Sequence, residues 1–409
     1  MNKDQKRSPS VTQRRRFLRL GLLGTVVGVG ATFMSSSASL DVLAQTPLPD
    51  TEAVAQTSAQ DASAVRAAAY MTSTNITRKT WPLRAEVLID SGSQAITALP
   101  ATAQLSGLRF QQQTFNNCGP ASLSMVLSYF GRSETQGDIA AVIKPYDDDK
   151  NVTPEELVSY ANAIGYNARI IEGGDLNLLK SFVANGLPVI VERWLDSGSD
   201  GEIGHFQVVM GYTQNQLEFY DSLQGENIKE SMTSFGEGWK VFNRHFVAFW
   251  PSEKETAVKT LLGARWDETV MLQQALAVAQ AEVKADEGDQ FAWFNLGTNQ
   301  VKLGNAAAAV DAFDTATSLK LPTRMLWYQF GIYEANLAVG NYEKVIRLTN
   351  NTIVTGGLEE NHYWRGLAYS AMGNQNAARR DFNRALQYNE NFQAAEDALQ
   401  KIDTLSYSP

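Results

Sequence analysis

The C-terminal third of the chain carries the spacing that most narrows the possible folds. Gly304, Gly340 and Gly373 lie 36 and 33 residues apart, and each is followed by Asn. A period of this length is typical of repeats in which each unit is a pair of antiparallel helices. Because one such unit cannot bury its apolar face alone, the pattern favours several units stacked side by side.

The segments around the first and third of these glycines share their small and aromatic positions. "WFNLGTNQVKLGNAAAAVDAFDTA" parallels "YWRGLAYSAMGNQNAARRDFNRAL", so that Gly297, Ala309, Phe313 and Ala316 match Gly366, Ala378, Phe382 and Ala385. The period and these matching small and aromatic residues resemble tetratricopeptide repeats. We therefore predict an all-α repeat domain over residues 264–405. Three helix pairs are expected, with an extra helix near 267–285. The middle repeat, "WYQFGIYEANLAVGNYEKV", is degenerate. The alternative to stacked repeats is a generic helical bundle.

The first 44 residues have the layout of an export signal. "QRRRFLRLGLLGTVVGVGATF" places three arginines before a short apolar, Gly-rich run, and Arg14 to Arg19 resemble the twin-arginine pattern. Gln13 departs from the usual Ser, and cleavage is expected after Ala44. The alternative is a short anchor that is never cleaved, which would be the chain's one link to a membrane. We therefore expect an extracytoplasmic protein, exported, secreted or at the cell surface.

Residues 103–252 change from a helical to a strand pattern along their length. Residues 45–102, rich in Ala, Ser, Thr and Gln, precede them as a linker and lead-in segment. Helices are predicted over 118–130, from a Thr-Pro-Glu-Glu start at 153, and over 175–186. The runs "LPVIVERWL", "HFQVVMGY", "QLEFYDS" and "HFVAFWP" then read as strands, with "TQN" as a hairpin turn. Helices followed by antiparallel strands indicate an α+β domain.

Cys118 is the only cysteine in 409 residues, so no internal disulfide is possible. It lies just before the first turn of the predicted helix at 118–130, where Pro120 is well tolerated. A helix N-terminus and a neighbouring imidazolium both lower the pKa of a thiol, because each favours the thiolate. We therefore treat Cys118 as a candidate nucleophile.

A base for this thiol has to come from the three histidines. His205 begins a predicted strand after a polar loop, His245 begins a later strand, and His362 lies in the repeats, where packing is its better interpretation. A hairpin would bring Asp221 to the end of the sheet that carries His205. There its carboxylate could accept the Nδ1 proton of His205 as the third member of a triad.

These segments together resemble a known family. "QTFNNCGPASLSMVLSYFG", "GHFQVVMGY" and "FYDSLQG" are similar to the bacteriocin-processing, double-glycine cysteine peptidases, and more closely to their stand-alone papain-like branch. The resemblance implies a papain-like fold with Cys118 as nucleophile, His205 as base and then acid, and Asp221 orienting the histidine. Gln113, in preference to Gln112, would complete an oxyanion hole with the backbone N–H of Cys118.

The expected activity is that of an exported thiol hydrolase, most simply a cysteine peptidase that cleaves a peptide or protein. The repeats would bind a protein partner. A formal net charge of −9 gives no basic surface for nucleic acid, and no cofactor or metal is expected, since no zinc-ligand spacing occurs. Two alternatives remain: an inactive adaptor with a papain-like domain, and a cell-wall amidase or amide-transfer enzyme.

Overall fold

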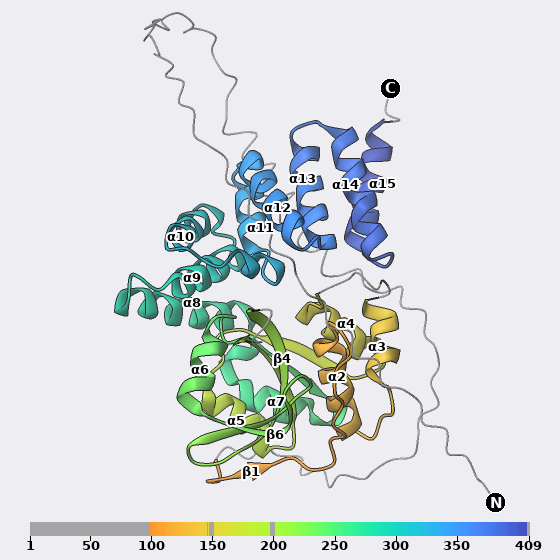
Figure 1. Cartoon of the computed structure of the whole chain (residues 1–409). Coiled ribbons are helices and arrows are strands. Elements are labelled where there is room, and N and C mark those ends of the chain that lie inside the picture. The colour runs from red at the N-terminus through yellow and green to blue at the C-terminus, as the bar shows by residue number, and fades with distance from the viewer. Residues whose placement is uncertain (1–98, 145, 147–150, 197–200, 407–409) are drawn as a thin grey trace, which may run out of the picture. The chain divides into compact units, whose positions relative to one another are not determined.

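The computed structural model describes residues 99–144, 146, 151–196 and 201–406 (Figure 1). The predicted export signal and most of the predicted linker lie outside these residues. Within them, an antiparallel sheet with its helices is followed by a helical repeat region, so the predicted fold class is confirmed. No helix among the described residues is both long and apolar enough to cross a bilayer.

One antiparallel sheet organises the first part of the fold. Its strands lie in the order β2-β7-β3-β4-β5-β6, and β1 pairs with β4. The strand bounds are β1 Ala103–Gln104, β2 Asn167–Ile171, β3 Val189–Asp196, β4 Glu202–Tyr212, β5 Gln216–Asp221, β6 Gly225–Ser231 and β7 Phe246–Trp250. The predicted hairpin between β4 and β5 is present. The short strands β1, β2 and β6 were not predicted.

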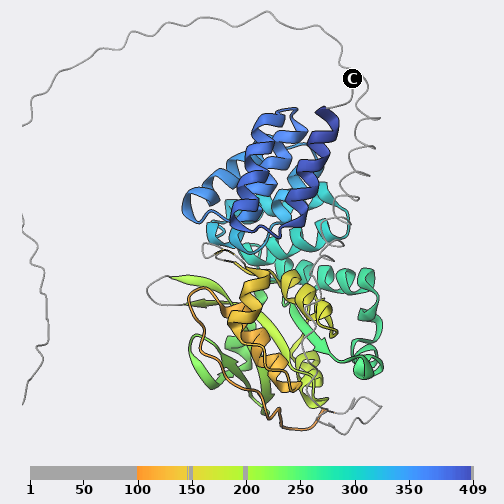
Figure 2. The same ribbon diagram turned by 90° about the vertical axis from the view of Figure 1, so that its right-hand side faces the viewer.

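The helices that accompany the sheet begin where local chemistry favours it. They are α2 Cys118–Tyr129, α3 Gln136–Ile143, α4 Pro154–Ala163, α5 Leu176–Ala184 and α6 Met232–Lys240. Thr153 and Glu156 form the predicted capping box of α4, with Pro154 at the first helical position. Helices α3 and α6 were not predicted. Figures 1 and 2 show α2, α3 and α4 grouped together beside the sheet.

A single apolar core lies between the sheet and these helices. Helix α2 contributes almost its whole length to it, with residues 119 to 128 buried. It is tied to the sheet by Ser122, whose Oγ donates a hydrogen bond of 3.2 Å to the Phe206 carbonyl of β4. The start of α2 is therefore fixed against the strand that carries His205.

Helices follow β7 to the end of the described residues. They are α7 Glu255–Leu262, α8 Glu268–Ala285, α9 Gln290–Lys302, α10 Ala306–Ser318, α11 Gly331–Ala338, α12 Tyr342–Thr355, α13 Glu359–Ala371, α14 Gln375–Tyr388 and α15 Gln393–Ser406. Val258 and Leu262 of α7 pack into the core of the sheet, so the repeats begin after α7. Gly297 of α9 faces Phe313 of α10, and a Cβ at Gly297 would lie 2.7 Å from the Phe313 ring. Gly366 and Phe382 repeat this arrangement between α13 and α14 at 2.6 Å. These are the small-residue contacts that the sequence predicted.

The middle repeat departs from this regular form. The short 3₁₀ helix η4, Thr323–Trp327, precedes α11, and α11 has only 8 residues where α9 and α13 have 13 each. Polar contacts join the repeats to the sheet region. Asn299 of α9 and Asn243 exchange two side-chain hydrogen bonds of 2.9 and 3.0 Å, and Lys302 forms an ion pair with the buried Glu172.

Candidate active site

Cys118 is placed by a tight turn ahead of α2. Asn116 adopts φ 55°, a left-handed conformation that Asn tolerates better than most residues, and Lys144 Nζ donates to its carbonyl at 3.0 Å. Asn117 is the N-cap, and its amide Nδ2 donates to Thr114 Oγ1 at 2.7 Å. Cys118 is therefore the first helical residue, one position further into the helix than the sequence predicted.

Gly119 allows two neighbours to close around this helix start. A Cβ at Gly119 would lie 3.1 Å from Val152 Cγ1 and 3.4 Å from the Phe206 ring. Any larger residue would push one of them away. Because the first N–H groups of a helix have no partner within the helix, the backbone N–H of Cys118 is available to an anion at this position.

His205 and Asp221 come together through the hairpin of β4 and β5. Gln207, two residues after His205 on the same face of β4, is directly opposite Asp221 in the register. His205 Nε2 and Asp221 Oδ1 lie 2.8 Å apart, and the exposed fractions of the two residues are 1% and 0%. The sequence placed this proton on Nδ1, and that detail was wrong. Asp221 binds Nε2, which leaves Nδ1 for the thiol side of the ring.

Both carboxylate oxygens of Asp221 accept hydrogen bonds. Its Oδ1 also accepts from the backbone N–H groups of Leu223, at 2.7 Å, and Gln224, at 2.9 Å. Its Oδ2 accepts from Gln207 Nε2 at 2.5 Å. Burial alone would raise the pKa of Asp221, but His205 and these donors outweigh it and the pKa is lowered. The carboxylate is therefore ionised although it has no contact with solvent.

The Cys118 thiol and the His205 imidazole each shift the pKa of the other. The shift favours the thiolate form of Cys118 and the imidazolium form of His205. Burial opposes the charged form of His205, but hydrogen bonding to Asp221 and Cys118 raises its pKa to about 9. Burial likewise opposes the Cys118 thiolate, and His205, with the backbone of Phe206, lowers its pKa below the ordinary value. Nδ1 of His205 is buried and has no aligned hydrogen bond among the described residues. The two pKa shifts have the directions expected for a thiolate beside an imidazolium.

Gln113 is held in place by the residue that follows Asp221. Ser222 Oγ donates to Gln113 Oε1 at 2.8 Å, and the Gln113 backbone N–H donates to the Ser222 carbonyl at 2.8 Å. With Oε1 engaged, the Nε2 group of Gln113 is the part left to act as a donor. Gln112 is exposed, and its Nε2 donates instead to the Leu223 carbonyl at 3.0 Å.

Comparison with known proteins identifies domains in two parts of the chain. Residues 99–247 match the model of the peptidase C39-like family, and residues 292–322 and 359–405 match the tetratricopeptide repeat. The chain carries a C39-like peptidase domain. Tetratricopeptide repeats follow it, a repeat class that generally mediates contacts between proteins. The stretch between the two matched repeat segments contains η4 and the degenerate middle repeat.

A comparison with solved structures finds matches to both parts, at low TM-scores. A C39-like peptidase from Bacillus anthracis is 18% identical, with a TM-score of 0.31, and the match covers 36% of this chain and 96% of that one. A MamA structure is 16% identical, with a TM-score of 0.31, over 37% of this chain and 83% of that one. At these values they add no argument about activity. No curated protein matches the chain.

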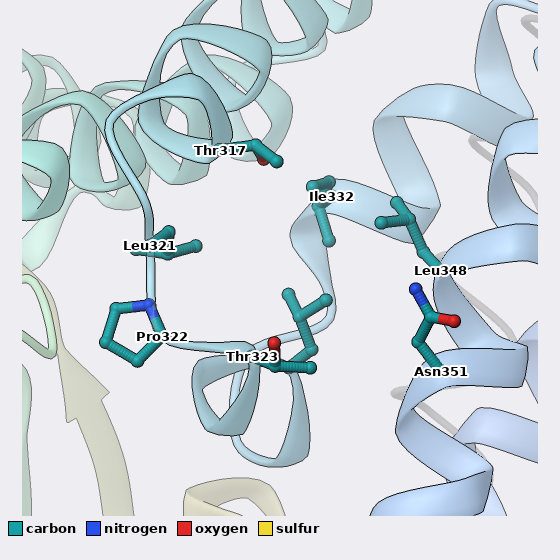
Figure 3. Close-up of a pocket in the computed structure, with 8 residues that line it drawn as sticks. Thr317, Leu321, Pro322, Thr323, Ile332, Leu348 and Asn351 are labelled. Carbon is teal, nitrogen blue, oxygen red and sulfur yellow. The ribbon is translucent and has the colours of Figure 1, made fainter. Parts of the chain in front are cut away.

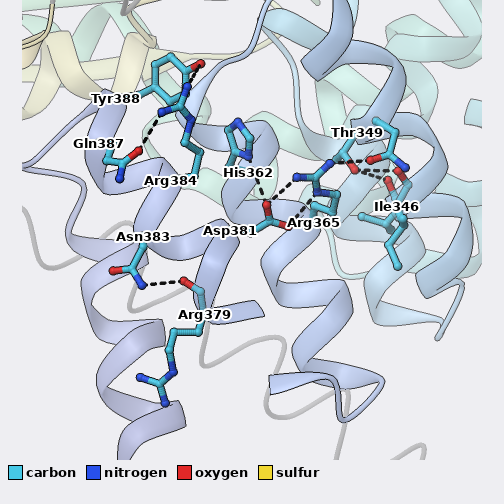
Figure 4. A network of polar contacts seen from close by, with 12 residues as sticks. Ile346, Thr349, His362, Arg365, Arg379, Asp381, Asn383, Arg384, Gln387 and Tyr388 are labelled. Atoms are coloured by element: carbon cyan, nitrogen blue, oxygen red, sulfur yellow. Dashed lines mark hydrogen bonds and ion pairs between the residues drawn. The ribbon is translucent and has the colours of Figure 1, made fainter. Parts of the chain in front are cut away.

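The other two histidines have carboxylate partners of their own. His245 Nε2 lies 2.9 Å from Glu192 Oε2 inside the C39-like domain. His362 Nδ1 lies 3.3 Å from Asp381 Oδ1 within the repeats, and its ring stacks on Tyr388 (Figure 4). His362 thus has the packing environment that the sequence indicated. No cluster of metal-ligating side chains occurs among the described residues.

Gln207 and Ser222 belong to the site, although the sequence did not single them out. Gln207 could have been found from the period of two along β4, which puts it on the same face as His205. Ser222 directly follows Asp221, and its hydroxyl is what fixes Gln113.

Proposed function

We propose that this chain is an exported thiol hydrolase of the cysteine peptidase type, with Cys118, His205 and Asp221 as its triad. The observation that carries the proposal is the buried pair of His205 and Asp221 beside the chain's only thiol. An ionised carboxylate without solvent contact, aimed at an imidazole that borders a helix-terminal cysteine, is the arrangement that thiol catalysis requires.

In the proposed reaction the thiolate of Cys118 attacks the carbonyl carbon of a peptide bond. The negative charge that develops on the carbonyl oxygen is met by the backbone N–H of Cys118 and by Gln113 Nε2. The imidazolium of His205 gives its proton to the leaving amine as the C–N bond breaks. Water then attacks the thioester while His205 takes up a proton from it, and the C–S bond breaks, which releases a carboxylic acid and restores the thiolate of Cys118 beside the imidazolium of His205.

Alkylation of the single thiol tests this proposal without a known substrate. The rate of modification by iodoacetamide is measured over a pH series for wild type, His205→Ala and His362→Ala. His362 is a matched control, because it too is buried beside an aspartate but lies in the repeats. At pH 6 we expect wild type and His362→Ala to react at least about tenfold faster than His205→Ala.

The opposite result would be equally clear. If all three proteins followed an ordinary thiol titration near ~8.5, the nucleophile would be lost and an adaptor role would be the better proposal. If His205→Ala alone reacted slowly but no peptide library were cleaved, the triad would stand and the substrate would not be a simple peptide.

Asp221→Asn tests the role of the carboxylate separately. Since the charge of Asp221 helps to raise the pKa of His205 to about 9, we expect the neutral amide to lower that pKa by at least about one unit. NMR titration of the imidazole C–H signals measures it directly. A wild-type His205 that titrated near its ordinary value would contradict the proposed ion pair.

Export is the part of the proposal that rests on residues 1–44. We expect Arg14→Lys with Arg15→Lys to retain the protein in the cytoplasm, whereas Arg16→Lys, at the variable position of the twin-arginine pattern, leaves export intact. Cell fractionation measures the difference. Equal export of both variants would remove the twin-arginine route from the proposal.

A further inference from the structure

The degenerate middle repeat directs a short segment toward the C39-like domain. The chain leaves α10, passes through η4, and reaches Tyr328 before α11 begins. On its repeat side the segment leaves a cavity of about 140 Å³ (Figure 3). The lining residues are Thr317, Leu321, Pro322, Thr323, Leu326, Ile332, Leu348 and Asn351. The segment is thus incompletely packed against its own repeat.

The other side of the segment makes closer contacts with the C39-like domain. The ring of Tyr328 lies 5.9 Å from that of Phe242 and 6.2 Å from that of Trp194. It also lies against Gly204, where an added Cβ would come within 3.0 Å of Tyr328 Cε1. Gly204 directly precedes His205, so Tyr328 reaches the strand at the position next to the candidate base.

Trp327, the residue before Tyr328, contacts the segment that precedes α4. Asn151 Nδ2 donates to the Trp327 carbonyl at 2.8 Å. Val152, the next residue, is the side chain that lies against Gly119, directly after Cys118. Two consecutive repeat residues are therefore connected to the surroundings of both Cys118 and His205.

Two further hydrogen bonds hold the segment in this position. Arg324 Nη1 donates to the Glu202 carbonyl of β4 at 3.2 Å, and Gln329 Nε2 donates to the Val241 carbonyl at 3.3 Å. Burial raises the pKa of the Tyr328 phenol, and the negative charge of Cys118 acts in the same direction. Tyr328 is therefore a neutral, largely buried ring within electrostatic range of the thiolate.

We propose that the repeat segment Thr323–Tyr328 forms a wall beside Cys118 and His205, and that Tyr328 limits the size of a molecule that can reach the thiol. Cys118 is partly buried and His205 is 1% exposed, so a ligand must pass the wall to reach them. The substrate class that fits is an extended, unfolded segment of a protein rather than a folded surface. The identity of the substrate as a peptide rests on the proposed function.

The test compares small and bulky thiol reagents on the full chain. Iodoacetamide and a fluorescein maleimide are reacted with Cys118 in wild type and in Tyr328→Ala. We expect the bulky reagent to react about tenfold faster after the substitution, while iodoacetamide changes by less than about twofold. Tyr369→Ala, which removes a partly buried ring elsewhere in the repeats, should leave both rates unchanged.

Two further variants guard against a folding artefact. Tyr328→Phe keeps the ring and should behave as wild type, and Tyr328→Leu should fall between wild type and Tyr328→Ala. Thermal melts identify any variant that has lost its fold. An unchanged bulky-reagent rate in a folded Tyr328→Ala or Tyr328→Leu protein would overturn the inference. Because only the ratio of the two rates is used, the result does not depend on whether Cys118 is catalytic.

Discussion

The interface between α4 and α13 contains two carboxyl groups whose environment makes stability depend on pH. Glu359 begins α13 and is 2% exposed; its Oε1 accepts from Asn389 Nδ2 at 3.3 Å. Glu156 of α4 is partly buried, and its Oε2 accepts from the Thr153 backbone N–H at 2.8 Å. Within the described residues Glu359 Oε2 has no hydrogen-bond partner. The pair therefore favours a neutral form.

Burial raises the pKa of Glu359 to about 7, against the opposing effects of Asn389 and of the positive charge of Lys144. Burial also raises the pKa of Glu156 to about 8, and the negative charges of Glu359 and Glu155 add to this. These carboxyls hold their protons longer in the folded chain than in the unfolded one. Their contribution to stability is thus fully present below pH ~4.5 and is lost as the pH rises through about 7 and 8.

Glu359→Gln removes one charge and keeps the shape of the side chain. A pKa of about 7 instead of 4.5 means that the charged Glu359 carboxylate destabilises the folded chain by at most about 3 kcal/mol at pH 8. We expect the variant to be roughly 1–3 kcal/mol more stable than wild type at pH 8. The lower part of this range applies because the structure around the charged carboxylate can relax and reduce the destabilisation. At pH 4, where this carboxyl is mostly neutral in both the folded and the unfolded chain, the two should agree within about 0.5 kcal/mol.

Urea unfolding followed by far-UV circular dichroism at the two pH values measures this difference. Glu343→Gln is the matched control, since Glu343 is also in the first turn of a repeat helix but is exposed. It should change stability equally at both pH values. If Glu359→Gln did the same, the argument that Glu359 is buried as a neutral acid at this interface would be refuted.

Two further predictions concern the oxyanion donor and the repeat packing. Ser222→Ala removes the hydrogen bond to Gln113, so we expect kcat toward a cleaved peptide to fall about three- to tenfold while the iodoacetamide rate is unchanged; an equal loss in both assays would point to a general structural defect. Gly366→Ala places a Cβ 2.6 Å from the Phe382 ring and should lower the free energy of unfolding by about 1–3 kcal/mol. Gly236→Ala, where no atom lies within 4 Å, should instead be neutral or slightly stabilising in the same denaturation assay.

Local patterns in the sequence were sufficient for the elements that local chemistry controls. The capping box at Thr153, the helix after Cys118 and the hairpin that ends at Asp221 all depend on residues close together in the chain. The same predicted hairpin placed Asp221 near His205. The glycine and phenylalanine anchors of the repeats were equally visible, because their spacing is fixed by the helical period.

Features that depend on distant pairing were not predictable. Strand β2 pairs with β7, about 80 residues later, and its sequence "NARII" has neither alternation nor a turn signal of its own. Which ring nitrogen of His205 meets Asp221 depends on the side of the ring at which α2 packs, and no local pattern records that. The approach of Tyr328 to Gly204 depends on how the repeats pack against the sheet region.

Asp221 was a difficult residue to interpret, because an aspartate at the end of a strand is most often a turn former. In the structure Asp221 binds the backbone of its turn and also contacts His205. One oxygen, Oδ1, accepts from His205 and from the backbone of the turn at Leu223 and Gln224. A relative that had lost catalysis would still need this aspartate to close its turn. Among related chains, retention of His205 is therefore the more informative sign of activity, and retention of Asp221 alone reports only an intact hairpin.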